Sequence, residues 1–348
     1  MLTPALRVAL GILTALAVAV ALYQASSVLA PLALALFAIA IVWPIQKRLQ
    51  SVMPTILALA ITVIATATVC FGIASLAVWA FTRVGHAAVV DSARYQTLYS
   101  RTIAWLDGHG ISVAGLWAEH FNVRWLLGLA QRVTERVNST LAFWLIGLTY
   151  LILGLLEVDD SRRKIQALDN REIARVLLEG SAATASKFRT YMLVRTEMSA
   201  VTGLLVGVFA WVTGLRFAVE WGVIAFVLNY IPFIGPFVAT LFPTLLAMTQ
   251  FDSWQAVLGM FVGLNLIQFA IGSYAEPRVA GSVLSISPTV VLFSIFLWTF
   301  LWGFFGTFIG VPITLAILTY CEQHPSSRWV ADLLGGPRRR EAKLRAHP

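Results

Sequence analysis

The sequence predicts an all-α polytopic membrane protein with about eight membrane segments. Its 348 residues are 59% hydrophobic and 12% charged, and the mean hydropathy is +0.80, which is typical of multi-pass membrane proteins. The stretch from Met198 to Cys321 carries only five formal charges: Arg216, Glu220, Asp252, Glu276 and Arg278. Several uncharged runs exceed the roughly 20 residues that a helix needs to cross a membrane, and they do not alternate as barrel strands do.

Residues 1–81 are expected to form three membrane spans, at about 5–23, 27–43 and 55–81. Pro44 is expected to end the second span, because proline removes a backbone donor and disfavours a continuing helix. The apolar N-terminal run is too long for a signal peptide and lacks a good cleavage site, so we expect it to remain as a first span.

Residues 82–139 are expected to form a small helical extramembrane region. Trp125, Leu129 and Val133 fall on one face of a predicted amphipathic helix. This helix lies either at the lipid interface or against a neighbouring subunit. Residues 140–196 are expected to hold a fourth span, at about 140–156, and a basic cytoplasmic helical segment.

The core, residues 197–320, contains ordinary spans at about 197–214 and 253–274 and two longer apolar segments at about 219–250 and 288–320. As single helices the longer segments would extend about 45 to 50 Å, well beyond an apolar thickness of about 30 Å. Each is therefore either a tilted, broken helix or a re-entrant hairpin with its Gly/Pro tip inside the protein. Hairpins are favoured. Residues 321–348 form a basic tail.

The distribution of basic residues predicts the orientation. Seventeen Lys and Arg residues fall on the side that carries both termini, and seven fall on the other. The positive-inside rule therefore places both termini in the cytoplasm. The same distribution explains the net charge of +8 without nucleic-acid binding. Cys70 and Cys321 are interpreted as small hydrophobic residues.

Two groups of helix-breaking residues are the main site candidates. The first comprises Asn229, Tyr230, Pro232, Gly235 and Pro236; the second comprises Gly303, Gly306, Gly310 and Pro312. Proline frees a backbone carbonyl one turn earlier, and freed carbonyls and half-helix ends hold ions or polar solutes in transporters. The alternative is that these residues only kink a helix and allow close packing. The pattern favours a transport path.

Charged residues at membrane depth are the candidates for coupling to an ion gradient. Glu276 is the first, followed by Asp252 and Glu220, because a buried charge in the membrane is costly and usually has a partner. Arg278 is expected to pair with Glu276 across Pro277; the alternative is a solvated loop. Asn265 and Gln268 either line a polar path or, as we favour, bond neighbouring helices.

The sequence contains no pattern for catalysis. It has no nucleophile elbow, P-loop, dinucleotide fingerprint or zinc signature, and its five histidines are scattered outside the predicted spans. We therefore expect no enzyme activity, cofactor or metal site.

Two motifs resemble a known family. "LNYIPFIGPFVATLFP" and "EPRVAGSVLSISPTVVLFSIFLWTFLWGFFGTFIGVPITLAIL" are similar to signature regions of the autoinducer-2 exporter (AI-2E) family of bacterial inner-membrane proteins. The resemblance implies about eight passes, a homo-oligomer such as a pentamer, and secondary transport. It also implies that Pro277, Gly281 and Pro288 belong to a functional loop motif. In the family, an acidic or amide residue often precedes this proline, where the present chain has Ile271, Gly272 and Ser273.

These observations favour a secondary transporter that exports a small polar solute resembling autoinducer-2 or exchanges cations across the bacterial inner membrane. Two other classes stay open. One is a membrane scaffold whose extramembrane region binds partners, and the other is a passive channel without gradient coupling.

Overall fold

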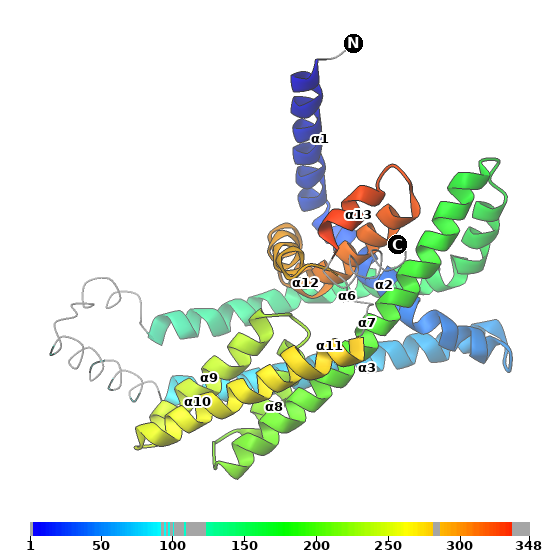
Figure 1. Ribbon diagram of the computed structural model, residues 1–348. Helices are drawn as coiled ribbons and strands as arrows, with labels where there is room; N and C mark the ends of the chain where they lie inside the picture. The colour runs from blue at the N-terminus through cyan, green and yellow to red at the C-terminus, as the bar shows by residue number, and fades with distance from the viewer. Residues whose placement is uncertain are drawn as a thin grey trace. The chain divides into compact units, whose positions relative to one another are not determined.

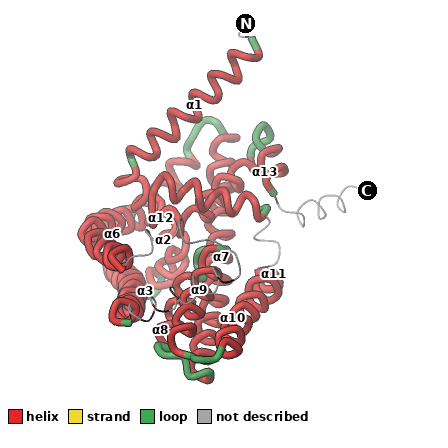
Figure 2. The backbone as a smooth tube through the Cα atoms, turned by 90° about the vertical axis from the view of Figure 1, so that its left-hand side faces the viewer, coloured by secondary structure: helices red, strands yellow, loops and turns green. Residues whose placement is uncertain are grey.

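The computed structural model describes residues 3–91, 123–280 and 286–335, together with Arg94, Thr97, Ser100 and Gly108. These residues are almost entirely helical (Figure 2) and include no strand, apart from an isolated β-bridge between Ile286 and Gly335. Six helices are long and apolar enough to cross a membrane, and residues 9–24, 218–228 and 234–250 form shorter apolar helices. The predicted class, an all-α polytopic membrane protein, is confirmed.

The chain folds as two compact units. Unit 1 comprises residues 1–68, 142–192 and 280–348, and unit 2 comprises residues 69–141 and 193–279. Helices α3 (Thr55–Val90), α6 (Val123–Gln166) and α7 (Arg171–Val212) each contribute to both.

Unit 1 is built around α2, α6 and α12. Helix α2 spans Ser26–Gln50 and α12 spans Pro288–Gln323 (Figure 1). Two further helices, α1 (Pro4–Gln24) and α13 (Arg328–Leu334), also lie wholly in this unit. Its core is an apolar cluster that joins α2 to α6 and consists of Ala35, Ile39, Val42, Leu151 and Leu155. These residues recur every three or four positions, so each helix presents one apolar face. α12 packs against α1, α2 and α13.

Helix α2 does not end at Pro44, as the sequence led us to expect, but continues to Gln50. Proline leaves the carbonyl of Ala40, one turn earlier, without its helical donor. The guanidinium of Arg189 supplies a replacement, since its Nη1 donates to the Ala40 oxygen at 3.1 Å. A donor from α7 thus lets an apolar helix pass through a proline.

Unit 2 contains α8 (Ala218–Leu228), α9 (Ile234–Gln250), α10 (Trp254–Phe269), the π-helix η1 (Ala270–Ala275) and α11 (Glu276–Ala280). α9 packs against both α8 and α10 (Figure 1). On α7, Gly203 and Gly207 face Gly222 of α8 so closely that a Cβ on Gly203 would lie 2.7 Å from the Gly222 carbonyl. Such contacts between small residues let helices approach closely in membranes.

Both long apolar segments fold back on themselves as helical hairpins, which is the chain reversal that the favoured interpretation requires. At the base of the first, the Gln250 side chain donates to the Gly214 carbonyl at 2.6 Å and accepts from the Arg216 amide at 2.9 Å. The second is α12, which reverses at Gly303, where φ is 60° and ψ is −140°. Across this reversal, Trp298 Nε1 donates to Thr314 at 3.2 Å. Neither segment is a single tilted helix.

Some sequence expectations fall outside the described residues. Between Val90 and Val123 the structure describes only isolated positions, and it gives no side chains for the start of α6. Residues 82–90 and 123–139 of the expected extramembrane region lie in α3 and α6, whereas the expectations for its middle part, for Gly281 and for residues 336–348 of the basic tail remain predictions.

Candidate functional site

The tip of the first hairpin, residues 229–233, is the centre of the candidate site. Gly235 permits the tight turn, because a Cβ at this position would overlap the backbone carbonyl of Leu228. Phe233 lies at φ 63° and ψ −52°, and the Ile234 amide donates to the Pro232 carbonyl at 2.7 Å. These values define a γ-turn of the rare, strained kind with positive φ. Strain of this type, which costs about 1 to 3 kcal/mol, is concentrated at functional sites.

The prolines at this tip do not leave free carbonyls, contrary to the expectation from sequence. Pro236 lies in the first turn of α9, where the amide N–H groups have no helical partner in any case. The carbonyls four residues before Pro232 and Pro236 are those of Leu228 and Pro232, and they accept from the Ile231 and Ile234 amides. The prolines therefore shape the turn.

Two side chains at the tip bond to α7. Asn229 is 5% exposed, and its Nδ2 donates to the hydroxyl of the fully buried Ser199 at 3.2 Å. The Tyr230 hydroxyl lies 2.9 Å from that of Thr196. The structure thus brings Asn229 and Tyr230 together with the hydroxyl groups of Ser199 and Thr196 on α7, which were not among the residues predicted for the site.

A buried ion pair lies beside the tip. Arg195 Nη1 is 3.1 Å from the Glu276 carboxylate, and the two side chains are 9% and 14% exposed. The same Nη1 makes a longer contact of 3.5 Å with the Asn229 carbonyl. Arg195 therefore connects α7, the hairpin tip and α11 through one guanidinium.

Glu276 does not pair with Arg278, as the sequence led us to expect. Its partner is Arg195, and the Arg278 guanidinium lies 3.3 Å from the centroid of the Tyr274 ring. The alternative of a solvated loop is also wrong, because the chain from Trp254 to Ala280 is continuously helical.

The π-helix Ala270–Ala275 directly precedes Glu276. It widens the helix just before the Glu276–Pro277 step, and short π segments are frequent at functional sites. Pro277 supplies a physical reason, since a proline here cannot donate to the Ser273 carbonyl in a regular α-helix. Ile271, Gly272 and Ser273, where the chain departs from the family pattern, form part of this π segment.

The base of the hairpin holds two further ion pairs of unit 2. Glu220 is 5% exposed, and its carboxylate lies 2.8 Å from Arg83 Nη1 on α3. Arg216 Nη1 lies 3.0 Å from Asp91. These pairs fix the hairpin base to the end of α3. Asp252, the remaining acidic candidate, is exposed between α9 and α10.

The amides on α10 make no hydrogen bond to the polar groups of the tip within the described residues. Asn265 is exposed, and its Nδ2 donates to the Phe261 carbonyl of its own helix at 2.8 Å. Gln268 Nε2 is buried and has no hydrogen-bond partner within the described part of the chain. The structure therefore gives neither amide a bond to another described helix.

Helix length gives the distance between the two ends of this hairpin. The 17 residues of α9 rise by about 25 Å at about 1.5 Å per residue. A hydrocarbon core is about 30 Å thick. If the base lies at one surface of the membrane, the Arg195–Glu276 pair lies in the far quarter of its thickness.

The second hairpin belongs to unit 1. Gly306 and Gly310 face the opposite half of α12, where a Cβ on Gly306 would overlap the Trp298 carbonyl. The turn is held to α1 by Trp302, whose Nε1 donates to the Leu22 carbonyl at 3.0 Å. Pro288 begins α12, and Pro312 is buried inside it. At this reversal, Gly306 and Gly310 allow the two halves of α12 to pack closely against each other.

Within the described residues, no group of three or more His, Cys, Asp or Glu side chains is placed to hold a metal ion. The polar chemistry of unit 2 is concentrated in the ion pairs and in the amide and hydroxyl groups around the hairpin tip. Membrane-spanning helices, helical hairpins and charges buried at a hairpin tip together define a multi-pass membrane protein built like a transporter.

Comparison with known proteins identifies the family of this membrane protein. The chain belongs to the AI-2E family of transporters, whose members it matches over residues 12–325. The family assigned from the two signature motifs is therefore confirmed.

Three relatives illustrate the similarity. The AI-2 transport protein TqsA of Escherichia coli strain K12 is 31% identical over 209 residues, which is 59% of each chain. YhhT of the same organism, provisionally named a transport protein, is 26% identical over 211 residues, or 60% of this chain and 58% of YhhT. A Haemophilus influenzae protein, also provisionally named a transport protein, is 28% identical over 145 residues, or 42% and 41%. These matches span less than two thirds of each relative.

Proposed function

We propose that this protein is a secondary transporter of the bacterial inner membrane and that the tip of the first hairpin binds its cargo. The observation that carries the proposal is the buried Arg195–Glu276 pair beside Asn229. A charged residue inside the membrane costs about 3 kcal/mol on insertion scales. A buried ion pair is often no more stabilising than apolar residues of similar volume, so stability alone is a poor reason for it.

The groups at the tip suit a small polar solute or a cation. Asn229, Tyr230 and Ser199 supply amide and hydroxyl groups, and Glu276 supplies a carboxylate. One relative is named as an AI-2 transport protein, which supports export of an autoinducer-2-like solute. Cation exchange is the alternative that the carboxylate supports.

Arg195 would couple the cargo to the hairpin. A proton or cation at Glu276 competes with the guanidinium for the same carboxylate, and Arg195 also contacts the Asn229 carbonyl. Release of Arg195 would therefore loosen the tip, where the backbone turn at Phe233 is strained. This would link occupancy of the site to movement of the hairpin.

The distribution of basic residues supports cytoplasmic termini. The hairpin base would then face the periplasm, and the Arg195–Glu276 pair would lie closer to the cytoplasm. We also propose that the protein forms a homo-oligomer, such as a pentamer, because the resemblance to the AI-2E family implies one.

The proposal is tested by comparing the metabolites inside and outside cells with and without the protein, and then measuring flux of the differing solute in proteoliposomes. A secondary transporter gives flux that depends on an imposed proton or sodium gradient. Flux that ignores both gradients would indicate a passive channel. If no solute or cation moves, the protein is not a transporter of these substrates, and the scaffold alternative is preferred.

A further inference from the structure

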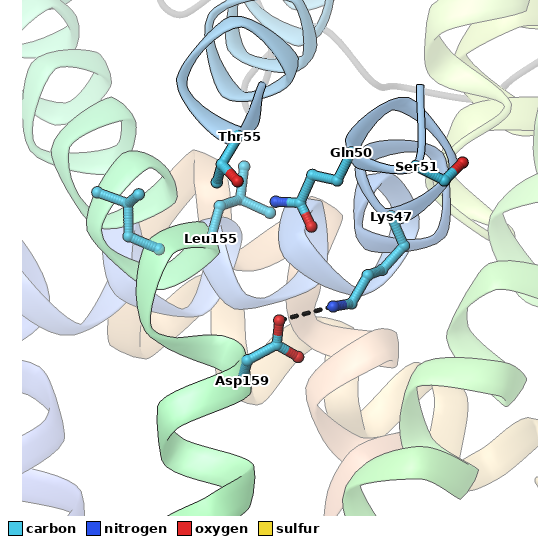
Figure 3. Close-up of a pocket in the computed structure, with 7 residues that line it drawn as sticks. Lys47, Gln50, Ser51, Thr55, Leu155 and Asp159 are labelled. Atoms are coloured by element: carbon cyan, nitrogen blue, oxygen red, sulfur yellow. Dashed lines mark hydrogen bonds and ion pairs between the residues drawn. The ribbon is translucent and has the colours of Figure 1, made fainter. Parts of the chain in front are cut away.

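A polar cavity lies in unit 1. It is formed by the end of α2, the start of α3 and the later part of α6, and its volume is about 490 Å³. Its lining consists of Lys47, Gln50, Ser51, Thr55, Leu155, Leu156 and Asp159 (Figure 3). A volume between about 300 and 1,000 Å³ is usual for a site that binds a small molecule.

The cavity contains one positive and one negative side chain that face each other. Lys47 Nζ lies 2.7 Å from the Asp159 carboxylate, and both side chains are 48% exposed. An ion pair this exposed contributes about 0 to 1 kcal/mol. A ligand that carries both charges can therefore separate the pair at little cost. In Figure 3 the Gln50 amide lies between Thr55 and this pair, while the Ser51 hydroxyl points away.

The two charges differ in their surroundings. Lys47 lies near the start of α3, a helix of 36 residues that begins at Thr55, and free backbone N–H groups at a helix start favour an anion such as phosphate. Asp159 lies near the end of α6, far from the start of that helix, so its carboxylate is left to meet a positive group.

The residues around the cavity are those expected where a helix leaves the membrane. Lys47 Nζ lies 5.0 Å from the centroid of the Trp43 ring, and Trp and Lys at the end of an apolar span mark the head-group level. Val52 and Ile56 are 83% and 80% exposed. Apolar side chains this exposed beside a polar cavity fit a ligand that has acyl chains.

We propose that this cavity binds the head group of an amino-phospholipid. The phosphate lies between Lys47 and the start of α3, the ammonium group lies at Asp159, and the acyl chains run along Ile56 and Leu156. An anionic head group without an amine would bring its charge close to Asp159, so a head group with both charges fits better. This site is independent of cargo transport at the first hairpin.

The test is native mass spectrometry of the full chain after purification with an equal mixture of phosphatidylethanolamine and phosphatidylglycerol. The wild type is expected to retain phosphatidylethanolamine preferentially. In Asp159→Asn this preference falls by about tenfold, the equivalent of one charge-assisted hydrogen bond. Asp160→Asn is the matched control, because Asp160 pairs with Arg163 on the same helix and does not line the cavity. Equal retention of the two lipids by the wild type would overturn the proposal.

A charge exchange separates lipid binding from a structural role of the pair. Lys47→Asp combined with Asp159→Lys restores an ion pair, so the melting temperature should return to the wild-type value. The acyl chains fix which end of the head group faces which residue, so the preference for phosphatidylethanolamine should stay lost. If the exchange restores both, the pair is only structural. If soluble glycerophosphoethanolamine displaces the lipid at equal concentration, the cavity binds a soluble solute and the proposal is wrong.

Discussion

Arg195 Nη1 lies 3.1 Å from the carboxylate of Glu276, although 81 residues separate the two along the chain. Both side chains are almost buried, and the guanidinium also contacts the Asn229 carbonyl at the hairpin tip. The pair therefore joins three segments of unit 2 at one point.

This arrangement predicts strong coupling between the two residues in stability. Arg195→Met leaves Glu276 buried without its counter-ion, and Glu276→Gln does the same to Arg195, so each should destabilise the protein by about 3 to 5 kcal/mol. The double variant has no unpaired charge and should lose much less than the sum. Unfolding in detergent measures all three. Additive losses would show that the pair does not interact energetically.

The close approach within the first hairpin predicts that Gly235→Ala is destabilising by about 1 to 3 kcal/mol, because the new Cβ overlaps the Leu228 carbonyl. Gly259→Ala is the matched control, since a Cβ on that helical residue of α10 meets no atom within 4 Å. The melting temperatures of the two variants provide the comparison. Equal effects would contradict the close approach of Gly235 to Leu228.

The strained turn predicts that Phe233→Gly is stabilising. Glycine adopts positive φ without the penalty of about 1 to 2 kcal/mol that other residues incur, and Phe233 is 51% exposed, so little packing is lost. Phe233→Ala keeps the strained backbone and should bring no gain. If alanine and glycine give the same melting temperature, the turn is not strained in solution.

The contact between Arg189 and Ala40 predicts a rescue at Pro44. Arg189→Met removes the donor to the partly buried Ala40 carbonyl and should cost about 1 kcal/mol, the lower end of the penalty for an unsatisfied acceptor. In a Pro44→Ala background, the alanine supplies a backbone N–H that can donate to the Ala40 carbonyl, so the same change should cost much less. A double-mutant cycle on thermal unfolding measures the difference, and an equal cost in both backgrounds would refute this explanation.

Much of this fold follows from the sequence for local reasons. The two long segments exceed the membrane thickness and contain Gly and Pro near their middles, so the hairpins with tips at Asn229–Phe233 and at Gly303 were predictable. The continuation of α2 through Pro44 was not, because it depends on Arg189, which is distant in sequence. The local sequence identifies the proline that interrupts the backbone hydrogen bonds of α2, but it does not identify the distant side chain that supplies the missing donor.

The candidate site was only half predictable. Asn229, Tyr230 and Glu276 stand out as polar residues in an apolar core, whereas Arg195 was counted among the basic residues of the preceding segment. One signal was present, since Arg195, Ser199 and Thr202 recur at helical spacing where the apolar half of α7 begins. Choosing Arg195 over Arg278 as the partner of Glu276 requires the packing of α7 against α11, which spacing along the chain does not contain.

The most direct test of the proposed transport site is the pH dependence of gradient-driven flux by Glu276→Gln in proteoliposomes. Glutamine keeps the size of the side chain and removes the charge, so the flux should lose its dependence on pH. Glu172→Gln, an identical change at an exposed position in the first turn of α7, should behave as the wild type. A Glu276→Gln protein with unchanged flux and an unchanged pH profile would contradict the assignment of the hairpin tip as the coupling site.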